Sequence, residues 1–141
     1  MKNIKLLLMS LLSIMTFGVN AQMLSKGVTK VLAENRNANI SNVLYDLSFN
    51  IPADINQKVT GKNIITFELK EDADVVLDFQ GGFDGTFYYY TGKKGKRRQA
   101  FATYKDEHII IPQKYLEPGK NKIELSFTSL DKALNRQKDY M

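Results

Sequence analysis

The sequence predicts an all-β protein, an antiparallel β-sandwich preceded by a short N-terminal helix. Three observations support this prediction. From Ile40 onward apolar and polar residues alternate with a period of two, which is typical of strands with one buried face. About six or seven short strand-like stretches recur at intervals of roughly 8–12 residues. The chain shows no alternation of strands with long amphipathic helices, so a parallel α/β fold is not expected.

Residues 1–21 have the pattern of a secretory signal peptide. Lys2 and Lys5 give a positive start, a largely apolar run follows over Ile4–Phe17, and Ala21 occupies the position that a signal peptidase reads. The apolar run is shorter than the roughly 20 residues that a membrane-spanning helix needs, which disfavours the alternative of an uncleaved anchor. We therefore expect cleavage after Ala21 and export of the protein, either to the periplasm or as a secreted protein.

The composition excludes several classes of site. The 141 residues include no cysteine and one histidine, His108. Disulfide frameworks, thiolate metal sites and cysteine nucleophiles are therefore excluded, and so are zinc sites that need two or three histidines from this chain. We expect no catalytic residue, no metal ligand and no cofactor in this chain. His108 is interpreted as a structural histidine at a strand edge, since no other ligands stand at suitable spacing.

Within the mature chain, residues 22–39 are expected to form a helical segment and residues 40–141 a single β-sandwich domain. Leu24, Val28 and Leu32 recur at helical spacing, and Asn35–Asn39 is expected to end the helix. The tail after residue 130 is weakly helical and polar. The expected strands, each bounded by turn residues, are 40–51, 59–69, 75–79, 86–91, 99–104, 108–111 and 123–127.

One surface stands out as a candidate for binding. Consecutive aromatic residues over 87–90 cannot all face one side of a strand, so some must point outward, and five basic residues follow over 93–98. Exposed aromatic rings can stack on sugars, and the basic residues can attract anions, although a solvated hairpin tip is the simpler interpretation of the basic turn. The candidate residues are Tyr88, Tyr90, Lys93, Lys94, Lys96, Arg97 and Arg98.

The order of these segments resembles the N-terminal β-sandwich domain of aminopeptidase N-like zinc metallopeptidases. Residues 40–49 are similar to the opening strand of that domain, and Gly61 with the alternating apolar positions after it is similar to the next strand. Leu77-Asp78-Phe79 resembles the third strand. The later segments that carry the resemblance are His108–Pro112, the turn around Gly119, Leu134-Asn135-Arg136 and Asp139-Tyr140.

The resemblance implies a saddle-like sandwich that scaffolds the peptide-binding cleft of an exported aminopeptidase. In that family the zinc ligands and catalytic residues lie in a following domain, so no catalytic residue is carried over to this chain, and the sandwich is expected to be incomplete at its C-terminal end. The partner would then be that catalytic domain. The alternative is a stand-alone exported module that binds a glycan or a protein, but not nucleic acid. The incomplete sandwich that the resemblance implies would leave an open sheet edge through which the chain can self-associate.

Overall fold

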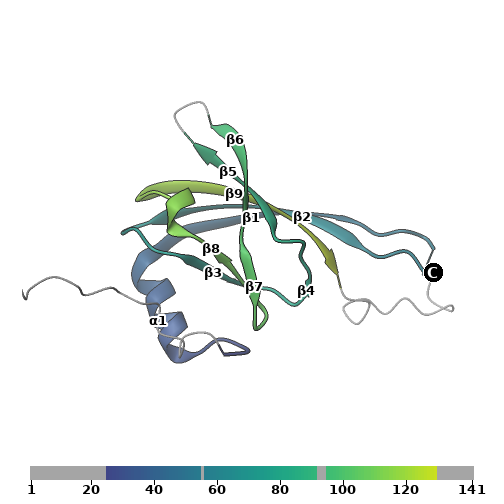
Figure 1. The fold of residues 1–141 in the computed structure, drawn as a ribbon, viewed down its shortest axis with the longest axis horizontal. Coiled ribbons are helices and arrows are strands. Elements are labelled where there is room, and N and C mark those ends of the chain that lie inside the picture. The colour runs from purple at the N-terminus through teal and green to yellow at the C-terminus, as the bar shows by residue number, and fades with distance from the viewer. Residues whose placement is uncertain (1–24, 55, 92–94, 130–141) are drawn as a thin grey trace, which may run out of the picture.

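The described part of the chain is an open assembly of two antiparallel sheets preceded by one short helix (Figure 1). The computed structural model describes residues 25–54, 56–91 and 95–129. The expected all-β class and the short helix in front of it are confirmed. The expected signal peptide, Lys93, Lys94 and the polar tail after residue 129 lie outside the described residues.

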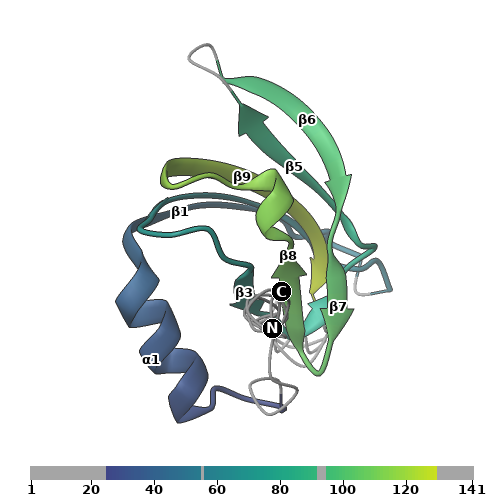
Figure 2. The ribbon, with the colours of Figure 1, turned by 60° about the vertical axis from the view of Figure 1, so that its left-hand side comes forward.

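The large sheet contains the longest strands of the molecule. Its strand order is β1-β2-β9-β5-β6, and a short strand β4 pairs with β9 beside this path. Strands β1, β2 and β9 run antiparallel across a broad layer, and the β5–β6 hairpin rises from it (Figure 2). The bounds are β1 Ile40–Asn50, β2 Thr60–Leu69, β4 Gly81–Gly82, β5 Thr86–Thr91, β6 Lys96–Phe101 and β9 Gly119–Ser129.

The small sheet has three strands in the order β3-β8-β7 and faces one side of the large sheet (Figure 2). Its strands are β3 (Val75–Asp78), β8 (His108–Ile111) and β7 (Thr103–Lys105). A single 3₁₀ turn, Gln113–Tyr115, follows β8 and leads back to β9. The strand predictions for 86–91 and 108–111 are confirmed with the expected bounds.

The core lies between the two sheets. Alternating residues of β2 and β9 face inward, and their register places Ile65 opposite Ile123. The small sheet covers these strands and β5, whose Phe87 is completely buried. The buried apolar cluster consists of Ile65, Phe67, Leu69, Val75, Phe87, Ala100, Ile109, Ile111, Ile123 and Leu125. None of these residues comes from β1.

Strand β1 corrects one expectation. Its alternation predicts one buried and one wet face, but after its first residue the whole strand is exposed. Tyr45 and Leu47, on the predicted buried face, retain 55% and 50% of their accessible surface. β1 is exposed because it is an edge strand of the large sheet, and the small sheet packs on β2, β9 and β5 instead. Periodicity shows which residues share a face, but not whether another layer covers that face.

Helix α1 spans Lys30–Asn39, so it begins later than the expected segment 22–39 and ends where that segment ends. The Thr29 hydroxyl accepts a hydrogen bond from the Leu32 backbone N–H at 3.1 Å, and this cap fixes the start of the helix. Gly27, just before it, has a φ of +83°, a conformation that a helix cannot contain. The helix continues through its asparagines to Ile40, where β1 begins.

The basic segment is also placed differently from the expectation. Residues 96–98, predicted as part of a turn, belong to β6, which starts at Lys96 and pairs along its length with β5. The strand predicted over 99–104 is interrupted at Ala102, where the chain passes from the large sheet to β7 of the small one.

His108 does not lie at a sheet edge, because β8 is the middle strand of its sheet.

Candidate functional site

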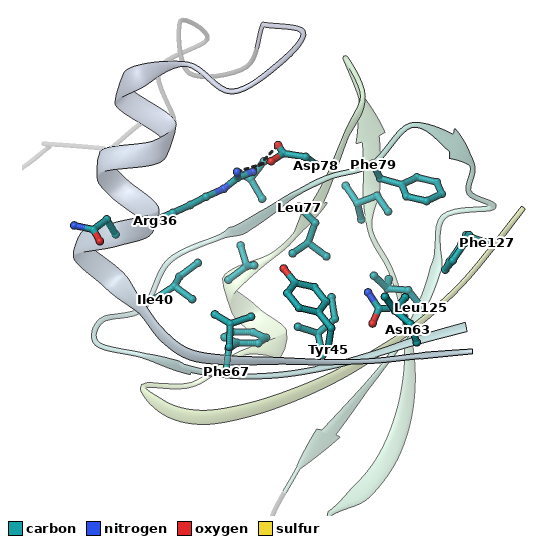
Figure 3. A pocket seen from close by; sticks show the side chains of 17 residues that line it. Arg36, Ile40, Tyr45, Asn63, Phe67, Leu77, Asp78, Phe79, Leu125 and Phe127 are labelled. Carbon is teal, nitrogen blue, oxygen red and sulfur yellow. Dashed lines mark hydrogen bonds and ion pairs between the residues drawn. The ribbon is translucent and has the colours of Figure 1, made fainter. Parts of the chain in front are cut away.

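An open apolar cavity of about 440 Å³ lies between the inner face of β1 and β2 and the small sheet (Figure 3). Its volume and largely apolar lining fall within the range of small-molecule sites. The end of α1 borders it on one side and Phe127 on the other (Figure 3). Its lining residues are Arg36, Asn37, Ile40, Val43, Tyr45, Leu47, Asn63, Ile65, Phe67, Val75, Val76, Leu77, Asp78, Phe79, Ile109, Leu125 and Phe127.

The cavity lies where the packed core meets strand β1, which the small sheet leaves uncovered. On the closed side, Ile65, Leu125 and Ile109 belong to the packed core. On the open side, Val43 and Leu47 of β1 line the same space but remain about half exposed. The cavity is therefore continuous with the core at its floor and with solvent along β1.

Aromatic rings close the end of the cavity away from α1. The Phe127 ring packs edge-on against Phe49 of β1 and against Phe79, with centroid distances of 5.9 and 5.3 Å. A side chain at Gly61 would leave no room for this arrangement, because its Cβ would stand 2.3 Å from the Phe127 ring. The glycine that the sequence places in β2 thus makes space for an aromatic wall.

Asn63 puts a polar group inside this apolar surface. It lies on β2 opposite Leu47 and Leu125, and its side chain reaches into the cavity (Figure 3). Its Oδ1 atom is buried and has no hydrogen-bond partner among the described residues. A buried acceptor without a partner costs about 1–3 kcal/mol, so a bound group with an N–H or O–H would be stabilised at this position.

A charged cluster borders the cavity where α1 approaches β3. The Arg36 guanidinium donates two hydrogen bonds to Asp78, at 2.6 and 2.7 Å, while its Nε is buried without a partner among the residues that the structure describes. Hydrogen bonding from Arg36, opposed by partial burial, lowers the pKa of Asp78 below its usual value. The fork geometry of the pair ties the helix to the small sheet.

His108 lies behind this pair and is 1% exposed. Its Nε2 is 3.0 Å from the Ser25 carbonyl oxygen. Its Nδ1 is 3.0 Å from Asp78 Oδ1, without the alignment of a full hydrogen bond. Through the Ser25 contact, His108 links the segment before α1 to the small sheet.

The sequence-predicted binding surface is divided between the two faces of the β5–β6 hairpin. Tyr90 is paired with Arg97 in the strand register, so these two residues share a face with Tyr88. The Arg97 guanidinium lies 3.3 Å from the centroid of the Tyr88 ring. Lys96 and Arg98, one residue to either side, are directed to the opposite face. Lys93 and Lys94 lie outside the described residues.

Glu124 of β9 organises the outer face and is the residue that sequence reasoning missed. It is 4% exposed and accepts hydrogen bonds from Tyr90 Oη at 2.7 Å and Arg97 Nη2 at 2.8 Å. The Lys62 ammonium is 3.0 Å away. These donors, Arg97 first, outweigh burial and lower the pKa of Glu124 to about 2. Glu124 alternates with the inward-facing Ile123 and Leu125, so the strand pattern alone gives no sign that it is buried.

Among the described residues, no group of three or more His, Asp or Glu side chains could hold a metal ion together. Within that same part of the chain, no helix has the length and apolar character that crossing a membrane requires. The arrangement on the inner face is suited to holding an apolar ligand, and the outer network is satisfied internally.

Comparison of the chain with protein-family models, with curated proteins and with solved structures finds no match.

Proposed function

We propose that the chain is an exported, non-catalytic binding module whose ligand site is the cavity between the sheets. The ligand is a small amphipathic molecule, with an apolar body and one hydrogen-bond donor. The observation that carries this proposal is Asn63, whose buried Oδ1 lacks a partner among the described residues and whose side chain lines an apolar cavity of about 440 Å³. The apolar body of the ligand would cover the half-exposed apolar side chains of β1 that line the cavity, and its donor would hydrogen-bond to the amide oxygen of Asn63.

The cavity favours such a ligand over a glycan. Its walls are aliphatic and aromatic, whereas a sugar needs several polar partners when it is bound. The outer face is less suited to sugar stacking than its sequence suggests, because Arg97 already covers the Tyr88 ring and Glu124 accepts the Tyr90 hydroxyl. Tyr88 and Tyr90 on this face help to hold the β5–β6 hairpin against β9 through Arg97 and Glu124.

The test uses two probes that differ in one donor. 2-Naphthol carries an O–H group, and 2-methoxynaphthalene has the same rings without it. We expect saturable one-to-one binding of 2-naphthol, measured by its fluorescence, with an affinity about fivefold higher than that of the ether, as one net hydrogen bond of about 1 kcal/mol provides. Asn63→Leu should abolish this preference while retaining binding of the ether.

A pair of tryptophan substitutions on β1 locates the site. Val43→Trp adds bulk at the cavity wall, and Leu44→Trp adds the same bulk on the exposed opposite face of the same strand. Val43→Trp should weaken 2-naphthol at least tenfold, while Leu44→Trp should bind as the unmodified chain does. Binding that is not saturable, or equal effects of the two variants, would overturn the proposal.

A second candidate is the scaffold domain of an exported zinc aminopeptidase. It is favoured by the apolar row along β1, which is half exposed and suited to contact with a neighbouring domain. The zinc and the catalytic groups would belong to that domain. Sequencing of the coding DNA beyond codon 141 tests this candidate: an in-frame helix with a His-Glu-x-x-His motif supports it, and an in-frame stop codon contradicts it.

The export on which both candidates rest has its own test. N-terminal sequencing of the chain recovered from the periplasm or the medium should begin at Gln22, since the signal peptide is expected to end at Ala21. A cytoplasmic product that retains Met1 would contradict export.

A further inference from the structure

In the part of the chain that the structure describes, the outer edge of β1 is unprotected. β1 pairs with β2 on one side, and no other described strand pairs with it. Proteins normally protect a long edge with lysine, proline or a central bulge, because the unpaired N–H and C=O groups are a template for another strand. β1 has neither lysine nor proline, and its one irregularity lies near its start, between Ser41 and Leu44.

The same edge carries a row of exposed apolar side chains. Val43, Tyr45, Leu47, Phe49 and Ile51 recur at every second residue and retain 45–58% of their accessible surface. A contiguous apolar row of this kind marks an interaction surface. Free main-chain groups and an apolar row on one strand together indicate a partner that supplies a strand.

We propose that this partner is a second copy of the chain, with the two β1 strands paired antiparallel about a two-fold axis at Leu47. In this register Leu47 faces the partner's Leu47, Tyr45 faces the partner's Phe49, and Val43 faces the partner's Ile51. Every apolar residue of the row thus meets an apolar residue, as an isologous interface requires. The two large sheets become one continuous sheet.

Charge and backbone geometry select this register over its neighbours. Asp46 is the only charged residue of β1, and centring on Leu47 places it opposite the partner's Ser48. Centring on Asp46 would oppose two carboxylates, which is destabilising. The paired segment, residues 43–51, also lies between Asn42, whose φ of 52° breaks the strand, and Pro52.

The dimer is independent of the ligand proposal but borders the same cavity. Because the two-fold axis is perpendicular to the sheet, both small sheets lie on the same side of the continuous sheet. The partner's Ile51 then stands beside Val43, at the open border of the cavity. Failure of the dimer would leave 2-naphthol binding to a monomer unaffected, so the two proposals fail separately.

Light scattering coupled to size-exclusion chromatography tests the interface. The chain at micromolar concentration should have twice the mass of the monomer. Leu47→Lys should give a monomer, because it places two ammonium groups opposite each other on the axis. Leu44→Lys, on the other face of β1, should remain a dimer. A monomeric unmodified chain at all concentrations would overturn the proposal.

Single cysteines test the register, since the chain has no cysteine of its own. Directly opposed residues lie within disulfide reach, whereas residues displaced by two or more positions do not. Leu47→Cys should cross-link to itself on oxidation, and Ser48→Cys should not. Tyr45→Cys and Phe49→Cys should cross-link when mixed, but neither should do so alone. Cross-linking of Ser48→Cys without Leu47→Cys would contradict the register.

Discussion

Replacement of Glu124 by glutamine tests the electrostatic account of the outer face. The carboxylate is buried, yet its pKa is held at about 2 against an ordinary value of 4.5 by hydrogen bonds from Arg97, Tyr90 and Lys62. That depression corresponds to about 3 kcal/mol of folding free energy. The Arg97 and Lys62 side chains are each 46% exposed and regain solvation when Glu124 is neutral, which reduces the loss. We expect Glu124→Gln to destabilise the chain by about 2 kcal/mol at pH 7.

The pH dependence of this loss has a definite sign. A carboxyl group whose pKa is lower in the folded state stabilises the fold above its unfolded pKa, and this stabilisation is lost as pH falls through the folded pKa. The stability of the unmodified chain should therefore fall between pH 4.5 and pH 2 relative to that of Glu124→Gln. Asp78 titrates in both proteins, so its contribution cancels in the difference.

Urea unfolding followed by circular dichroism at pH 7, 4 and 2.5 measures the effect. The two unfolding free energies should differ most at pH 7 and converge toward pH 2.5. A difference below about 0.5 kcal/mol at pH 7, the usual range for a surface substitution, would refute the reasoning. So would a difference that does not change with pH. Arg98→Ser, on the opposite face of β6, is the matched control and should leave stability and its pH profile unchanged.

Two further predictions concern the walls of the cavity. Gly61→Ala should destabilise the chain by about 1–3 kcal/mol in thermal unfolding, because the added Cβ would overlap the Phe127 ring. Phe127→Leu in the same chain should recover part of the loss. Equal stability of Gly61→Ala and the unmodified chain would contradict this close approach. Asp78→Asn should break the ion pair with Arg36 and lower the free energy of unfolding by about 1 kcal/mol. Amide hydrogen exchange should then accelerate more in α1 than in β2. Unchanged exchange in α1 would show that the pair does not hold the helix.

Much of the fold follows from alternation and turn chemistry. The strand over 86–91 was predicted with its observed bounds because aromatic and β-branched residues fill it and turn residues flank it. The strand over 108–111 was predicted in the same way, since a proline follows it. Local patterns were least informative at helix α1, where the Thr29 cap and the positive φ of Gly27 moved its start.

The candidate sites depended on pairing between distant strands, which the sequence does not display. Glu124 looks like any solvated residue of an alternating strand until β5 and β6 bring Tyr90 and Arg97 over it. The cavity likewise arises because the small sheet leaves β1 uncovered, a consequence of topology and not of any single segment. A polar Asn63 among the inward-facing residues of β2 was the one signal that could have indicated a ligand site.

An NMR titration of the isotope-labelled chain with 2-naphthol tests directly whether the cavity is the ligand site. We expect saturable shift changes at Val43, Leu125 and the Asn63 side-chain amide, with the backbone amide of Glu124 unaffected. The same titration with 2-methoxynaphthalene should perturb the apolar residues but leave the Asn63 side chain largely unchanged. Shift changes centred on β5 and β6, or absent from the cavity residues at saturation, would contradict the assignment of the cavity as the ligand site.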